Sequence, residues 1–156
     1  MYSDREEILK ILRGTPIVLR SLVRGLDHAT WRRRPADGEW AIVEVVAHVA
    51  DTDERALGRV RRMLDEERPV LPGYDQEALA VERRYLEMDP DEALDRFERI
   101  RREHVAVLEG LDDAGWRRPG VHAEQGPMDV LLYEHHVAGE DVDHMAQIAR
   151  MVPAAD

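Results

Sequence analysis

The sequence of 156 residues predicts an all-α fold, and more narrowly a four-helix bundle. Apolar residues recur three and four positions apart over four long segments, which is the pattern of helices that bury one face. Convincing period-two alternation, which would indicate strands, is missing. Pro and Gly punctuate the chain between the long segments, and both residues end helices. We therefore expect one bundle domain that covers residues 1–156.

The first expected helix covers roughly residues 4–26, and Pro16 inside it is expected to kink or split it. A loop over residues 27–39 leads to the second helix, which covers roughly residues 41–67. Pro69 ends this helix, because the residue before a proline is disfavoured in the α conformation. The first two long helices are therefore joined by a loop of about a dozen residues.

The second half of the chain contains the remaining helices. Asp75 is expected to cap a short helix, and Asp89 followed by Pro90 is a favourable start for a long one. Pro127 is expected to begin the last helix. In order, the expected elements are a crossover over residues 68–75, a short helix over 75–87, a third long helix over 90–111, a loop over 115–126 and a fourth long helix over 127–151.

Composition restricts the classes of partner. The formal net charge of -11 argues against nucleic acid, because binding to phosphates needs basic surfaces. Cysteine is absent, which excludes disulfides and Cys-ligated zinc and suits a cytoplasmic protein. The charged first ten residues do not resemble a signal peptide, and no apolar run approaches the length that spans a membrane. We expect a cytoplasmic protein with a small-molecule partner and no membrane segment.

The chain also resembles itself. The segment G25-L-D-H-A-T-W-R-R33 recurs as G110-L-D-D-A-G-W-R-R118, and each copy is followed by a helix that carries His-Val-Ala. Two copies are too few for a solenoid, so we interpret them as two helical hairpins with Trp-anchored loops. The second and fourth helices are therefore expected to play matching roles. The tryptophans expected to anchor loops are Trp31, Trp40 and Trp116.

One group of side chains has the chemistry of a metal site: His48 in the second helix, and Glu140 and His144 in the fourth. Residues four apart lie on one face of a helix, so Glu140 and His144 can contact the same ion. A histidine from another helix would complete a three-ligand set with open positions. His136 precedes Glu140 by four residues but falls toward the polar side, so it is not expected to be a ligand. From spacing alone, unrelated surface residues remain the alternative.

Two further residues are candidates for contact with a substrate. Tyr133 lies on the same flank of the fourth helix as the proposed ligands and is expected to reach a pocket beside them. Arg55 lies one to two turns after His48 and could meet an anionic substrate. The favoured alternative for Arg55 is an ion pair with Asp51 or Glu54.

Other ionisable side chains have less defined roles. Asp53 lies near the apolar stripe of the second helix, where it is expected to pair with a buried arginine or, less favourably, to orient a metal-ligating imidazole. His136 is a candidate to hydrogen-bond a ligand, although surface exposure is the favoured interpretation. For His28, His104 and His122 the sequence suggests no convergent partner.

Four motifs occur along the chain in this order: P35-x-x-G38-E-W40, E44-V-V-A-H48-V-A-D51, L71-P-G-Y-D75 and H136-V-A-G-E140-D-V-D-H144-M-A-Q-I148. In this order and spacing they resemble the DinB-like (DinB/YfiT) superfamily of metalloenzymes over most of the chain. The resemblance implies a four-helix bundle with up-down-down-up connectivity, with a short extra helix here in the crossover, and often a homodimer. It also implies a divalent metal held by one His of the second helix and an H-x-x-x-H pair of the fourth.

The chain departs from that pattern at Glu140, which replaces the first His of the pair. The resulting His/Glu/His set resembles that of the mycothiol-dependent maleylpyruvate isomerase branch, and two His with one Glu form a known catalytic zinc set. Two nitrogens and a carboxylate suit zinc as the first choice and nickel as the second. Because the imidazoles must be neutral, metal affinity is expected to fall below about pH 6.5.

Two functions are compatible with these residues. The first is a metal-dependent enzyme in which the cation activates a thiol or a water, with hydrolysis as the competing version of the reaction. The resemblance implies a thiol-dependent transferase or isomerase that uses a low-molecular-weight thiol. The second is a non-catalytic, stress-associated helical dimer that binds metal or a small ligand. The features that favour the second hypothesis are the replacement of His by Glu140 and the lack of a clear general base beyond the ligands.

Overall fold

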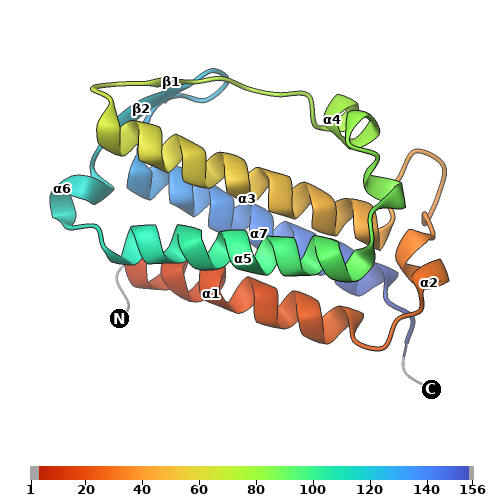
Figure 1. Cartoon of the computed structure of the whole chain (residues 1–156). Helices are drawn as coiled ribbons and strands as arrows, with labels where there is room; N and C mark the ends of the chain where they lie inside the picture. Colours follow the sequence, from red (N-terminus) through yellow and green to blue (C-terminus); the bar gives the residue numbers. More distant parts are fainter. Residues whose placement is uncertain (1–3, 155–156) are drawn as a thin grey trace.

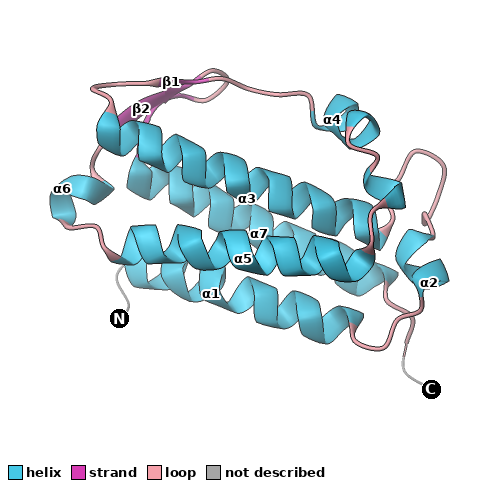
Figure 2. Ribbon diagram, in the orientation of Figure 1, coloured by secondary structure: helices cyan, strands magenta, loops and turns pink. Residues whose placement is uncertain are grey.

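The protein is a bundle of four long helices, shown in Figure 1, and the computed structural model describes residues 4–154. The long helices are α1 (Asp4–Val23), α3 (Ile42–Asp65), α5 (Pro90–Glu109) and α7 (Val130–Met151). The short ones are α2 (His28–Arg32), α4 (Gln76–Glu82), η1 (Tyr85–Glu87) and α6 (Asp113–Trp116). Helix dominates in Figure 2, so the predicted all-α bundle is confirmed. Within the described part of the chain, no helix combines the length and apolarity that a membrane crossing requires.

The connectivity is up-down-down-up, as the resemblance implied. In Figure 1, α1 and α7 run from left to right, whereas α3 and α5 run from right to left. The segment between α3 and α5 returns along the whole length of the bundle and carries α4 and η1. A connection of this length allows two consecutive long helices to be parallel neighbours, which a short loop would not.

The connections also form a small sheet that the sequence patterns did not predict. Its strands are β1 (Val70–Leu71), β2 (Pro119–His122) and β3 (Gly126–Asp129), in the order β1-β2-β3. The pair β1–β2 is parallel and the pair β2–β3 is antiparallel. Strands of two to four residues are too short for alternation to be recognised. The sheet attaches the crossover to the segment that precedes α7.

The expected start of the fourth helix at Pro127 was wrong. Pro127 lies in β3 opposite Val121, and the helix begins three residues later. Asp129 is its N-cap, and the carboxylate accepts a hydrogen bond from the backbone N–H of Leu132. Pro127 therefore belongs to the hairpin that β3 forms with β2, and the side-chain cap of Asp129 sets the start of α7.

The other predicted boundaries differ less. Asp75 and Asp89 cap α4 and α5 as expected. The short helix predicted to reach residue 87 ends at Glu82, because Arg84 adopts a left-handed conformation with φ of 54° before η1 begins. This conformation cannot continue an α-helix.

Pro16 does not split α1, because a partner on another helix satisfies the carbonyl that the proline leaves unpaired. Proline has no N–H, so the carbonyl of Leu12 loses its helical donor. Arg101 of α5 donates to this carbonyl at 3.0 Å. Helix α1 is therefore continuous from residue 4 to residue 23. The carbonyl of Leu12, which lacks a donor within the helix, instead attaches α1 to α5.

Arg101 is also the centre of a buried network that reaches the other two long helices. Its guanidinium donates to Asp53 of α3 at 3.0 Å and to both carboxylate oxygens of Asp141 of α7. His104, one turn further along α5, contacts Asp53 at 2.9 Å and Glu134 of α7 at 3.0 Å. All five side chains are buried. Asp53 therefore pairs with a buried arginine, which was the favoured interpretation of this residue.

The network keeps His104 protonated. Burial by itself lowers the pKa of this imidazole, but the charge of Glu134 and the hydrogen bonds to Asp53 and Glu134 outweigh burial and raise the pKa to about 10. The sequence suggested no convergent partner for His104, and that expectation was wrong. The partners are more than 25 residues away in the chain, which is why local spacing could not find them.

Replacing Arg101 by methionine is expected to destabilise the protein by about 3–5 kcal/mol, because Asp53 and Asp141 are left as buried charges without their shared partner. Urea denaturation followed by circular dichroism measures this change. The matched control is Arg102→Met at the exposed neighbouring position, where a change within about 0.5 kcal/mol is expected. Equal effects of the two substitutions would contradict the role given to the network.

Protonation of His104 makes stability depend on pH. Its pKa is raised from 6.5 to about 10 on folding, so its contribution is fully present below pH 6.5 and is lost as the pH rises toward 10. The free energy of unfolding, measured by urea denaturation between pH 6.5 and 9.5, should therefore fall more in the wild type than in His104→Gln. The exposed His135→Gln variant should follow the wild type. Parallel curves for wild type and His104→Gln would disprove this linkage.

Candidate metal centre

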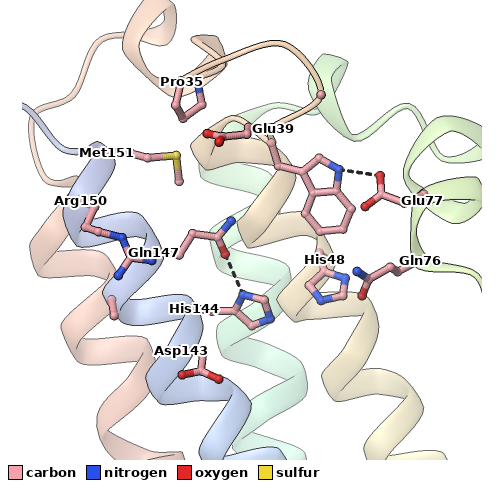
Figure 3. A pocket seen from close by; sticks show the side chains of 13 residues that line it. Pro35, Glu39, His48, Gln76, Glu77, Asp143, His144, Gln147, Arg150 and Met151 are labelled. Carbon is pink, nitrogen blue, oxygen red and sulfur yellow. Dashed lines mark hydrogen bonds between the residues drawn. The ribbon is translucent and has the colours of Figure 1, made fainter.

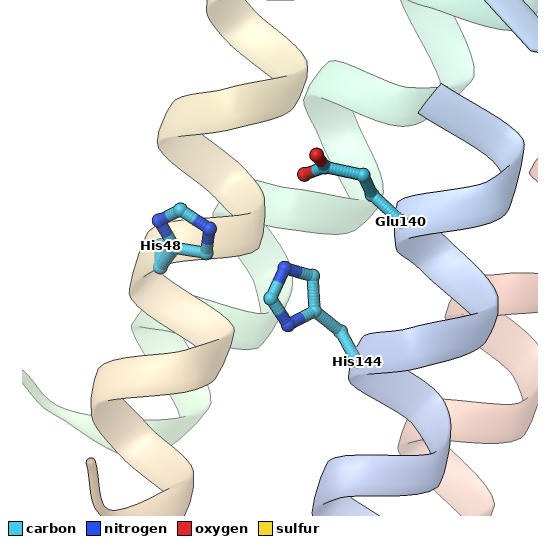
Figure 4. A group of neighbouring side chains, drawn as sticks. All are labelled: His48, Glu140 and His144. Atoms are coloured by element: carbon cyan, nitrogen blue, oxygen red, sulfur yellow. The ribbon is translucent and has the colours of Figure 1, made fainter. Parts of the chain in front are cut away.

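The three predicted ligands converge between α3 and α7. One ligand atom each from His48, Glu140 and His144 can be chosen so that all three lie within 4.8 Å of one another. Figure 4 shows the two imidazoles and the carboxylate facing a common point, with His48 on one helix and the other two residues on its neighbour. Donor atoms around one tetrahedral zinc lie about 3.4 Å apart, given zinc–ligand distances of about 2.1 Å. Small side-chain rotations would therefore bring the three donors to bonding distance, and the set fits a divalent cation.

The first turns of α3 and the residue before it place His48. Glu44 accepts a hydrogen bond from the backbone N–H of Ala41, and Arg34 holds the same carboxylate at 2.8 Å. Trp40 lies just before the helix, with its ring centroid 4.9 Å from that of His48. The indole N–H donates to Glu77, as Figure 3 shows, which attaches α4 to this end of the bundle.

His48 is held in its neutral form. Its side chain is buried, and burial lowers the pKa to about 4, with the neighbouring His144 acting in the same direction. The two imidazole centroids are 4.9 Å apart. At neutral pH the ring therefore carries a lone pair, which is the form that binds a metal ion.

His144 has its orientation set by its own helix. Nδ1 lies 3.0 Å from the side-chain oxygen of Gln147, one turn further along α7. An amide oxygen only accepts hydrogen bonds, so Nδ1 carries a proton, and in the neutral ring Nε2 is the nitrogen that can bind a metal ion. A metal-ligating histidine commonly donates its other N–H to such an acceptor. Gln147 was not identified from the sequence, although it lies three residues from the predicted ligand.

Two cavities border the triad, and both contact Gln76 of α4. The larger, of about 700 Å³, is lined by His48, His144 and Trp40. Figure 3 shows this cavity, with Gln147 and Arg150 of α7 on one side and Gln76 and Glu77 on the other. The smaller, of about 320 Å³, is lined by Glu140 and extends toward the β2–β3 hairpin. We call these the proximal and the distal cavity.

Of the predicted substrate contacts, Tyr133 lines the distal cavity and Arg55 does not. The guanidinium of Arg55 lies 3.7 Å from the ring centroid of Tyr74. Among the described residues it forms no ion pair with Asp51 or Glu54, both of which pair with Arg96 of α5, so the favoured expectation for Arg55 was wrong.

Asp53 and His136 do not contact the triad. Asp53 points to the opposite side of α3, where Arg101 and His104 bind it. The imidazole that it contacts is therefore that of His104, which is not one of the three predicted ligands. His136 is exposed and lines the distal cavity beside Glu140. No hydrogen bond among the described residues joins His136 to His48 or His144.

Two residues of the distal cavity were missed by sequence reasoning. His122 comes from β2 and lies 3.4 Å from Arg59 of α3, measured between Nε2 and Nη1. The expectation that His122 has no convergent partner was wrong, because the unrecognised hairpin brings it to the bundle. Arg59 could have been found as the continuation of the helical stripe that begins with His48, eleven residues earlier.

The predicted tryptophan anchors divide into two kinds. Trp31 and Trp116 are buried in the hydrophobic core, as expected for loop anchors. Trp40 is less buried and lines the proximal cavity. Its position against His48 makes it part of the site.

Fold and site together define a helical-bundle protein with a candidate divalent-metal centre of two His and one Glu. The chain belongs to the DinB superfamily, whose family model matches residues 11–148. Among curated relatives, YfiT of Bacillus subtilis is 25% identical, over 96% of this chain and 90% of YfiT. A relative from Geobacillus thermodenitrificans is 28% identical, over 86% of this chain and 81% of its own. Both relatives are named as metal-dependent hydrolases on a provisional basis.

Solved structures agree on the fold. The structure of Bacillus subtilis YfiT, described as a probable metal-dependent hydrolase with an unusual four-helix bundle topology, superposes with a TM-score of 0.80 at 22% identity, covering 94% of this chain and 86% of that one. A mycothiol-dependent maleylpyruvate isomerase gives a TM-score of 0.76 at 14% identity, covering 95% of this chain and 63% of the isomerase. At these identities the likeness establishes the shared bundle.

Binding of a paramagnetic metal at the triad should quench the fluorescence of Trp40, because its ring lies against that of His48. Titration of the metal-free protein with Ni²⁺ is expected to lower tryptophan emission in the wild type and in Trp31→Phe. The response should be lost in Trp40→Phe. Quenching that persists in Trp40→Phe would place the ion elsewhere.

Proposed function

We propose that this chain is a divalent-metal-dependent enzyme in which His48, Glu140 and His144 hold the ion. The observation that carries the proposal is the convergence of two imidazole nitrogens and a carboxylate from two helices, beside two cavities. The names of the relatives support the same class of activity. Zinc is the first choice of metal and nickel the second, because both accept this donor set.

The bound cation would supply a Lewis acid that lowers the pKa of a thiol or a water. The protein supplies the rest of the arrangement. Burial keeps His48 neutral, and Gln147 holds the proton on Nδ1 of His144. Trp40 covers one side of His48, and Gln76 lines both the proximal and the distal cavity. These contacts orient the ligands and leave space for a substrate on both sides of the triad.

The proposed reaction is thiol-dependent transfer or isomerisation with a low-molecular-weight thiol as cosubstrate. The mycothiol-dependent maleylpyruvate isomerase, which has the same bundle, supports this version of the reaction. Hydrolysis is the competing version, and the names of the curated relatives support it. Both need a polar cavity for a small molecule, and the proximal and distal cavities have the volume range of small-molecule sites.

The alternative is a non-catalytic, stress-associated helical dimer that binds metal or a small ligand. Exposed apolar side chains on α1 favour an association surface, since Ile17 is 71% exposed and Val18 is 42% exposed. This alternative requires a site for metal or for a small ligand but no turnover. A homodimer is compatible with either function.

Metal content of untagged protein tests the site. The wild type is expected to retain about one equivalent of metal, as a three-ligand site does. His48→Ala and His144→Ala should each weaken metal affinity by more than about 100-fold, which exceeds the loss typical when a residue that hydrogen-bonds a metal ligand is replaced. The control His136→Ala should behave as the wild type, and Glu140→His, which restores the common family pattern, should keep the metal.

Activity assays separate the two functions. Thiol-conjugation and ester-hydrolysis assays on metal-loaded protein should show turnover that disappears in His48→Ala and persists in His135→Ala, because the exposed side chain of His135 lines neither cavity. Metal bound at one equivalent without turnover in either assay would favour the non-catalytic alternative. Equally little metal in the wild type and in the double variant His48→Ala, His144→Ala would remove the basis of the proposed function.

A further inference from the structure

The distal cavity is a continuation of the candidate metal centre along α3 and α7. The two helices are antiparallel, so His48 meets His144 at one end and Arg59 meets Tyr133 at the other. Glu140 and Tyr133 are seven residues apart on α7, which corresponds to about 10 Å along the helix. A substrate in the distal cavity could therefore reach from the triad to the Arg59 end.

At that end, the backbone of the β2–β3 turn sets the protonation of His122. Nδ1 accepts hydrogen bonds from the backbone N–H groups of Glu124 at 3.2 Å and Gln125 at 3.3 Å. A nitrogen that accepts carries no proton, so the proton of the neutral ring is on Nε2. Burial and the charge of Arg59 lower the pKa of His122, which supports the neutral form. His122 therefore directs an N–H group, and not a lone pair, toward Arg59.

Arg59 and His122 consequently face each other as two donors. Arg59 Nη1 lies 3.4 Å from His122 Nε2, although guanidinium nitrogens only donate. Its other contacts are neutral acceptors, the hydroxyl of Tyr133 at 3.3 Å and the backbone carbonyl of Pro72. Within residues 4–154, no carboxylate lies at ion-pair distance from Arg59. This contrasts with Arg96 and Arg101, whose charges are matched by carboxylates.

Tyr133 adds a third donor. Its oxygen accepts from Arg59, so its own hydrogen is available to another acceptor. Burial raises the pKa of Tyr133 to about 12, which keeps the hydroxyl protonated. Two carboxylates also line the cavity, but Glu140 belongs to the triad and Glu124 is exposed and lies beside Gly73. The end formed by Arg59, His122 and Tyr133 therefore presents donors and a positive charge.

We propose that Arg59, His122 and Tyr133 form a subsite for a carboxylate group of the substrate, about 10 Å from the metal centre. A planar carboxylate accepts two parallel hydrogen bonds from a guanidinium, and it would give the facing donors of Arg59 and His122 a common acceptor. The substrate class is a small molecule with a carboxylate at one end and its reacting group at the other. The assignment of the reacting end rests on the proposed function, whereas the subsite itself does not.

The test uses metal-free protein and glutarate as the probe. In calorimetric titrations at low ionic strength, glutarate should bind the wild type, and binding should weaken at least about tenfold in Arg59→Gln, the loss expected for a charged hydrogen bond. Tyr133→Phe, which keeps the ring, should weaken binding several-fold. Arg61→Gln removes an arginine of the same helix that pairs with Glu103, so it is the matched control and should bind as the wild type.

Three outcomes would overturn the subsite. They are equal binding of glutarate by Arg59→Gln and Arg61→Gln, equal binding of the uncharged diamide of glutarate, and tighter binding of inorganic phosphate than of glutarate. Nuclear magnetic resonance provides a readout that does not depend on folding of the arginine variant, because glutarate should shift the His122 Nε2–H signal of the wild type. These measurements need no metal. A negative result would therefore contradict the carboxylate subsite and leave the proposed metal centre untouched, and a negative result in the metal analysis would leave the subsite untouched.

Discussion

The buried network around Arg101 is the constraint on which the rest of the structure depends. It joins all four long helices, since Arg101 and His104 of α5 bind Asp53 of α3, Asp141 and Glu134 of α7, and the carbonyl of α1 that Pro16 leaves without a donor. Buried charges tolerate little misplacement, because each one needs its partner in place. The network therefore sets the rotation of α3 and α7 about their own axes.

That rotation also determines the functional face. Each acid of the network is preceded in the chain by a residue that lines the distal cavity: Thr52 precedes Asp53, Tyr133 precedes Glu134, and Glu140 precedes Asp141. Neighbouring residues on a helix point about 100° apart, so a helix that directs the acid into the core directs its neighbour toward the cavities. Core polarity and site geometry are thus consequences of the same helix orientation.

Local spacing predicted much of the site, and long-range pairing accounts for what was missed. Glu140 and His144 follow from a four-residue interval within one helix, and His48 from the resemblance and the pseudo-repeat. Arg59 and His122 meet across 63 residues, and His122 arrives through a hairpin whose strands are too short to show alternation. Pro127 was assigned to a helix for the same reason, because strand pairing competes with local propensity only in the folded chain.

The sequence by itself determined the all-α class, the helix caps at Asp75 and Asp89, and the three candidate ligands, because helix periodicity and capping act within a few residues. Tertiary structure decided which charges are matched and which are not. Arg101, Arg96 and Arg59 look alike in the sequence, yet the first two face carboxylates and the third faces a neutral imidazole and a phenol. The difference arises because helix packing decides which side chains face each arginine, and the composition of the chain does not specify those neighbours.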